Sequence, residues 1–283
     1  MVRKYKYKSL RQRLGAFVII LSLYGIGGEY TAWAQTSSSA DDFTDSTQFS
    51  TIKDLFDKGV ALDQQGYRQE AISVWDKIIH EFGRGQDLTT QRFVAGSLRN
   101  KGIDLDKLKR YEESIATDNE IIRRFQGLQD LTLQQQVAGA LVDKGIDLDK
   151  LRRYEESIAT DDEIIRQFGG LQNIEIQRFV AGALRNKGAT LAELQRYEEA
   201  IATNDELIRR FGDSQDLTIQ QKIAMALYNR GVSLVFLKRF GQAKADCDAL
   251  IQRFKESQDP VIQKIIAMAQ QDFTSLPQAQ EGK

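Results

Sequence analysis

The residues best suited to chemistry in this 283-residue sequence are aspartates in two Asp-Leu-Asp motifs. The pairs are Asp104 with Asp106 and Asp147 with Asp149. Paired carboxylates can serve in acid–base catalysis or bind calcium. In a helix, however, residues two apart point to different faces, and a later copy of the motif has Thr190 at the first position. We therefore expect a solvated helix face, with calcium binding or catalysis as the alternative.

The other reactive side chains are one histidine, His80, and one cysteine, Cys247. A structural zinc site normally needs four ligands, and a single cysteine cannot form an internal disulfide. We expect a surface histidine and a buried or half-buried thiol, with pairing of Cys247 between two chains as an alternative. The glycines form no nucleotide-binding loop. The sequence thus predicts a protein that is not an enzyme and that uses no metal or cofactor.

The N-terminus has the order of a secretory signal peptide. Six basic residues within 1–13 precede an apolar run at 14–28, and Ala32 and Ala34 supply the small residues of a cleavage site. We expect cleavage after Ala34 and a periplasmic or secreted location in a bacterium. An uncleaved signal anchor is the alternative, and no stable membrane insertion is expected after cleavage. Removing the leader lowers the formal net charge from −1 to −6, which predicts no nucleic-acid partner.

A period of 43 residues fills the chain beyond a polar segment at 35–50, which we expect to be a flexible linker. Three sets of residues carry the period. They are Gly59, Gly102, Gly145, Gly188 and Gly231; Phe82, Phe125, Phe168, Phe211 and Phe254; and Asp87, Asp130, Asn173, Asp216 and Asp259. The repeats predict one helical domain over 51–273, followed by a flexible tail at 274–283.

Each repeat is expected to contain two helices. The first begins after the Asp/Asn position, whose side chain can cap the exposed backbone N–H groups, and after the last such position Pro260 suits a first helical turn. The second runs from an aromatic residue, Tyr154 in the third repeat, to the Phe position. The repeated glycine lies within the first helix, and twelve residues later comes Ala71, Ser114, Ser157, Ala200 or Ala243. These small residues predict a close crossing of the two helices.

The glycine in the first helix and the Tyr197-Glu198-Glu199-Ala200 start of the second resemble the tetratricopeptide repeat (TPR). The resemblance is to longer-period bacterial TPR-like repeats, because the usual unit has 34 residues. It implies an all-α fold, a right-handed α-solenoid of five TPR-like helix pairs plus a C-terminal capping helix from Pro260 to about Phe273. In that family the first helices line a concave groove that receives a partner's peptide or helix.

The least uniform positions of the repeat lie one turn before the glycines. We take the following as candidate groove residues: Arg99, Asn100, Asp143, Arg185, Asn186, Tyr228 and Asn229. Arg and Asn can hold a carboxylate or a peptide backbone, and a tyrosine can anchor an interface. The alternative is that they are ordinary exposed helix residues. The functional expectation is an exported scaffold or adaptor that binds a protein or peptide on its concave face. A self-associating structural spacer in a cell-envelope assembly is the alternative.

Overall fold

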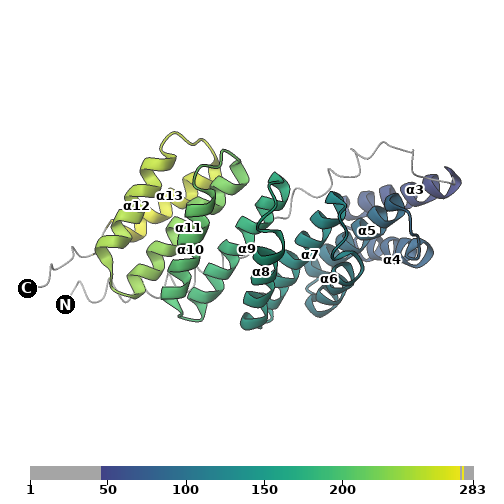
Figure 1. The fold of residues 1–283 in the computed structure, drawn as a ribbon, viewed down its shortest axis with the longest axis horizontal. Coiled ribbons are helices and arrows are strands. Elements are labelled where there is room, and N and C mark those ends of the chain that lie inside the picture. Colours follow the sequence, from purple (N-terminus) through teal and green to yellow (C-terminus); the bar gives the residue numbers. More distant parts are fainter. Residues whose placement is uncertain (1–45, 275, 277–283) are drawn as a thin grey trace, which may run out of the picture. The chain divides into compact units, whose positions relative to one another are not determined.

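The structure is a computed structural model that describes residues 46–274 and 276. The expected signal peptide, with Ala32 and Ala34, lies outside the described residues, as do most of the expected linker and tail. Helix labels follow Figure 1. The helices are α3 (Ser46–Gln64), α4 (Arg68–Phe82), α5 (Leu88–Lys107), α6 (Tyr111–Phe125), α7 (Leu131–Lys150), α8 (Tyr154–Phe168), α9 (Ile174–Glu193), α10 (Tyr197–Phe211), α11 (Leu217–Phe236), α12 (Phe240–Phe254) and α13 (Pro260–Phe273).

The all-α fold class is confirmed: no strand occurs among the described residues, and helices contact their neighbours in sequence order, as in an α-solenoid. Four repeats have a long helix of 20 residues (α5, α7, α9 and α11), the first repeat has the 19-residue α3 in its place, and each is followed by a short helix of 15 residues. The long helices begin at Leu88, Leu131, Ile174 and Leu217. The chain therefore has a TPR-like helical repeat fold, and α13 occupies the expected place of a capping helix.

The chain consists of two compact units, and the boundary between them follows Thr160, within α8. In the described part, the N-terminal unit is residues 46–160 and the C-terminal unit is residues 161–274 and 276. Inside the N-terminal unit α5 contacts α3 and α7, and inside the C-terminal unit α11 contacts α9 and α13. Helix α3 begins at Ser46, so residues 46–50 are helical and do not belong to the linker expected there. Phe49 explains the extension, because its ring packs edge-on against Phe93 at 6.2 Å between centroids.

The caps and turns follow the repeat. Each long helix and α13 begins with a side chain that accepts a hydrogen bond from the backbone N–H three residues later, as predicted. The caps are Asp87, Asp130, Asn173, Asp216 and Asp259. At the other end, four residues adopt a left-handed backbone conformation between the paired helices: Lys109, Arg152, Gln195 and Lys238. Reversal of the chain there is stabilised by bonds such as Arg110 N–H to the Leu105 carbonyl (2.8 Å).

The repeated glycine of α3, α5 and α9 admits a side chain from the following short helix, although the partner differs from the expected one. The small residues twelve positions later are fully buried, yet the nearest side chain to the glycine comes sixteen positions later in three repeats. A Cβ on Gly59 would lie 2.4 Å from the Trp75 ring, one on Gly102 would lie 3.2 Å from Asp118, and one on Gly188 would lie 3.1 Å from Asn204. The missing Cβ thus makes room for an aromatic ring or a buried polar group.

Candidate functional site

The predicted groove residues are mostly buried. Arg99, Arg185, Asn186, Tyr228 and Asn229 are each less than 9% exposed, whereas Asn100 and Asp143 are half-buried. The expectation that this set forms an accessible binding surface is therefore wrong for the five buried residues. The physical reason is that long helices of successive repeats contact one another, so a residue one turn before the glycine faces the next repeat and not the solvent.

Two of these side chains donate a hydrogen bond to a residue 44 positions later, on α7 in one case and on the capping helix α13 in the other. Arg99 on α5 donates from Nε to Asp143 Oδ2 on α7 at 2.7 Å. Tyr228 on α11 donates its hydroxyl to Asp272 Oδ2 on α13 at 2.9 Å. Within one helix, Arg185 Nη1 donates to the Asn186 side-chain oxygen at 2.7 Å. Arg99 and Asp143 thus join two successive repeats and Tyr228 joins the last repeat to α13, whereas Arg185 and Asn186 bond to each other within α9.

A second glycine in the long helix explains how Arg99 can be buried. Its guanidinium lies across the backbone at Gly139, where an added Cβ would be 1.5 Å from Nη1. The equivalent glycine 43 residues later, Gly182, meets only the Lys222 Cε at 3.4 Å. The absence of a Cβ at Gly139 is therefore required by the position of the Arg99 guanidinium, whereas a Cβ at Gly182 would make only an ordinary contact.

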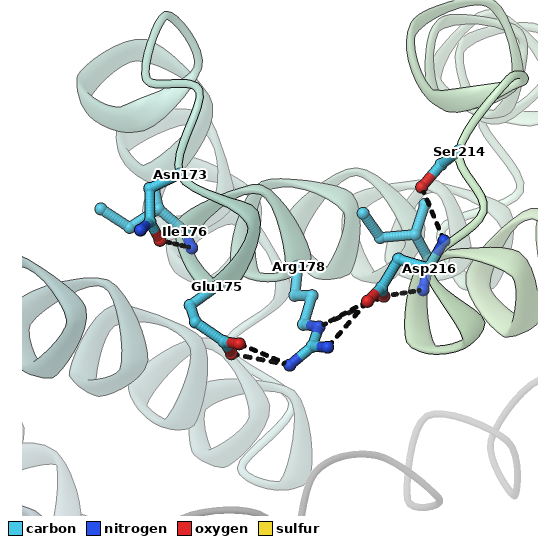
Figure 2. A network of polar contacts seen from close by, with 7 residues as sticks. Asn173, Glu175, Ile176, Arg178, Ser214 and Asp216 are labelled. Carbon is cyan, nitrogen blue, oxygen red and sulfur yellow. Dashed lines mark hydrogen bonds and ion pairs between the residues drawn. The ribbon is translucent and has the colours of Figure 1, made fainter. Parts of the chain in front are cut away.

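A second set of bonds joins a long helix to the cap of the next repeat, 38 residues away. Arg92 Nη2 donates to Asp130 Oδ2 at 2.6 Å, and Gln221 Nε2 donates to Asp259 Oδ2 at 3.1 Å. Figure 2 shows the same arrangement at Arg178, whose guanidinium lies between Glu175 of its own first turn and Asp216. Asp216 thus caps α11 and also holds α9. Sequence reasoning found the caps but missed their arginine partners, although these recur at one position of the repeat.

The Asp-Leu-Asp motifs do not form the solvated face that was expected. Asp104 and Asp147 are each 1% exposed, and only Asp106 and Asp149 are half-buried. Asp104 accepts a hydrogen bond from the Trp75 indole at 3.0 Å, and Asp147 accepts one from Lys150 at 3.0 Å. Burial raises the pKa of Asp104 to about 7, with the neighbouring Asp63 adding to the effect, and burial likewise raises the pKa of Asp147 to about 7.

No group of acidic, histidine or cysteine side chains in the described part of the chain could hold a metal ion. Within residues 46–274, no helix has the length and apolar character needed to cross a membrane. His80 is exposed, and Cys247 is a buried thiol whose pKa is raised by burial. Both side chains are placed as the sequence predicted.

An outward-facing set of apolar side chains was not anticipated. The first residue of each long helix is 41–49% exposed: Leu88, Leu131, Ile174 and Leu217. In the loops before two of these helices, Leu128 and Leu171 are each 36% exposed. We call these six residues the apolar edge. Their period of 43 could have revealed them, but an apolar residue next to a helix cap is usually taken as part of the core.

The sequence matches no known protein family and no curated protein. Among solved structures it is similar to the crystal structure of Bacillus thuringiensis PlcR in complex with the peptide PapR7 and DNA. The identity is 18% and the TM-score is 0.46, over 76% of this chain and 75% of that one. This likeness assigns no family and no ligand to the chain.

The expectation of no nucleic-acid partner is withdrawn. The similar chain, PlcR, was crystallised with both a peptide and DNA. The exclusion was based on net charge, which is a sum over the whole chain and does not describe the potential of one face. An acidic total is therefore insufficient to exclude nucleic acid for a helical repeat protein.

Proposed function

We propose that this chain is a non-enzymatic scaffold of the longer-period, 43-residue bacterial TPR-like type that binds a protein or peptide partner. The observation that supports the proposal most directly is the apolar edge. Large apolar side chains exposed at one position of every long helix are unfavourable in water unless a partner covers them. The buried polar bonds between repeats hold each unit in a regular form, so binding requires little ordering of the scaffold.

The proposed contact differs from the groove inferred from sequence. Within the N-terminal unit the edge is Leu88, Leu128 and Leu131, and within the C-terminal unit it is Leu171, Ile174 and Leu217. Each set offers apolar contacts beside the capped start of a helix, where a partner's carboxylates would meet a favourable helix dipole. A partner segment that combines apolar and acidic side chains fits this chemistry.

We further propose that the chain is exported by its N-terminal leader, with cleavage after Ala34, and acts in the periplasm or outside the cell. The support is the order of basic, apolar and small residues described above. The intact mass of the protein purified from its native source tests this point. A mature chain that begins elsewhere than Gln35 contradicts the cleavage site.

The binding proposal is tested by cross-linking pull-down and mass spectrometry with the mature chain and a Leu131→Glu/Ile174→Glu variant. Glutamate in a first helical turn suits the helix dipole, so the variant is expected to fold normally. The control is Gln129→Glu/Gln172→Glu, which adds the same charge at exposed sites without removing apolar surface. We expect a partner that is captured by the mature chain and the control but lost by the apolar-edge variant. Equal capture by all three contradicts the proposal.

Charge reversal of Arg99 and Arg185 is a poor test, because both side chains are buried and the variant is expected to unfold. The alternative of a self-associating spacer is examined by light scattering on the same proteins. A defined oligomer of the mature chain that dissociates in the Leu131→Glu/Ile174→Glu variant would assign the edge to a second copy of the chain.

A further inference from the structure

Asp118 on α6 is a buried carboxyl group without a visible function in the fold. It is 1% exposed, and neither of its oxygens has a hydrogen-bond partner. It points at α5, where Oδ1 lies 3.2 Å from the place of a Cβ on Gly102. The glycine therefore admits a group whose ionised form is costly to bury without a partner.

The charged groups around Asp118 come from α5 and α7. They are Arg99 on α5 and Asp143, Lys144 and Asp147 on α7. Arg99 is bonded to Asp143 at 2.7 Å, and Lys144 is bonded to Asn119 at 2.8 Å. The two nearby cations are thus engaged with other side chains, while two further carboxyls add negative charge around Asp118.

Asp147 brings a second buried carboxyl to the same three helices. It faces Lys150 of its own helix, Asp106 of α5 and the Ser114 hydroxyl of α6. Lys150 is shared, because it also pairs with Asp106. One ammonium group therefore serves two carboxylates, and the joint of α5, α6 and α7 carries more buried acid than base close to Asp118 and Asp147.

We propose that the contact of α5, α6 and α7 is a proton-sensitive joint, packed while Asp118 and Asp147 are protonated and loosened when both ionise. While Asp118 and Asp147 are protonated and neutral, the three helices hold the middle of the N-terminal unit together. When the carboxyls lose their protons, mutual repulsion and the need for water favour separation of α6 from its neighbours. In the C-terminal unit, α10 has Asn204 at the position of Asp118 and α9 has Thr190 at the position of Asp147, whereas Asp161, the first described residue of that unit, repeats Asp118.

The direction of the pH effect follows from linkage. Burial raises the pKa of Asp118 well above its usual range, with Asp143 adding to the effect, and raises that of Asp147 to about 7. The folded joint therefore binds protons that the unfolded chain has already released above a pH of about 4. Stability of the joint is greatest at or below that pH and falls as the pH rises through about 7.

Hydrogen exchange measured by mass spectrometry at pH 5.5 and pH 8, corrected for intrinsic exchange rates, tests the proposal. For the wild-type chain, we expect protection of α6 and α7 amides to fall roughly tenfold or more between the two pH values. Protection of α10 in the C-terminal unit, where Asn204 stands at the position of Asp118, serves as the internal reference. The matched variant Asp118→Asn/Asp147→Thr carries the residues of the C-terminal unit and is expected to lose this pH dependence.

Two results would overturn the proposal. The first is wild-type protection of α6 and α7 that does not change relative to α10, and this result needs no variant. The second is a variant that keeps the wild-type pH dependence. If the double variant does not fold, the single variant Asp118→Asn is compared in its place, and the wild-type measurement alone still decides.

Discussion

The N-terminal and C-terminal units place different chemistry at the same points of one repeat. Asp104 and Asp147 are buried in the long helices of the N-terminal unit, whereas the C-terminal unit has Thr190 and Ser233 there, also buried. Thr190 and Ser233 satisfy their hydroxyls within the helix by bonding to the carbonyl four residues earlier, at 3.1 and 3.0 Å. A hydroxyl can be satisfied locally, but a carboxyl must find a proton, a cation or a donor from another helix.

The short helices show the same contrast with one exception. Asp118 in the N-terminal unit corresponds to Asn204 and Cys247 in the C-terminal unit, although Asp161, at the boundary, is also buried. Asn204 donates its amide to the Ala200 carbonyl at 2.8 Å. The same helix geometry therefore accommodates either a buried carboxyl or a buried neutral polar group. Buried carboxyls make the stability of the N-terminal unit depend more on pH and on the neighbouring cations.

The largest expected difference between the units concerns Arg99 and Arg185. Arg99→Ala leaves Asp143 without its guanidinium and removes a cation from beside Asp118, so we expect a loss of about 3–5 kcal/mol in unfolding free energy. Arg185→Ala removes a hydrogen bond to the neutral Asn186 and should cost about 1–3 kcal/mol. Urea unfolding of both variants checks this order, and equal losses would contradict the contrast.

The next effect is the pH dependence that Asp104 gives to the N-terminal unit. Its pKa is raised to about 7 by burial, so its folded form keeps a proton that the unfolded chain loses above a pH of about 4. Unfolding free energy should fall by about 2–4 kcal/mol as the pH rises from 4 to 7. Asp104→Asn keeps an acceptor for Trp75 and should remove this fall.

The converse variant, Thr190→Asp, should bring a similar pH dependence into the C-terminal unit. Unfolding followed by urea titration at several pH values measures both variants. The comparison fails if Asp104→Asn retains the wild-type slope, or if Thr190→Asp leaves the C-terminal unit insensitive to pH.

A smaller difference is expected at the second glycine of the long helix. Gly139→Ala forces Arg99 from its position and should cost about 1–3 kcal/mol, as other overpacked substitutions do. Gly182→Ala meets only the flexible end of Lys222 and should be neutral or stabilising by up to about 1 kcal/mol, because alanine favours the helix. Thermal unfolding monitored by circular dichroism is sufficient, and a Gly139→Ala variant as stable as wild type would show that Arg99 can move without loss.

The smallest difference is expected where the two units have the same chemistry. Asp130 and Asp216 each cap a long helix and accept an arginine from the preceding long helix. Replacement of either by alanine removes a cap, at about 1 kcal/mol, and a partly buried ion pair, at about 1 kcal/mol. The two variants should therefore lose similar stability in urea unfolding. Unequal losses would mean that the units differ in more than their buried polar groups.

Sequence reasoning succeeded where a signal is local to one helix. The cap side chains, the aromatic starts of the short helices and the Pro260 start of α13 depend on backbone groups a few residues away. It failed for the groove residues and for Asp104 and Asp147, because polar side chains were assumed to be exposed. Some of their partners are distant in the sequence, by 29 residues for Asp104 and Trp75 and by 44 residues for Arg99 and Asp143.

The period, the helix type and the ends of most helices follow from the amino-acid sequence, because capping and turn formation involve only neighbouring residues. The face of each long helix that the next repeat covers follows from the packing of the helices. That packing buried Arg99 and Asp118, set Gly139 beneath a guanidinium and left Leu131 exposed. Such outcomes depend on how neighbouring helices cross, and a repeat pattern in one dimension does not contain the crossing geometry.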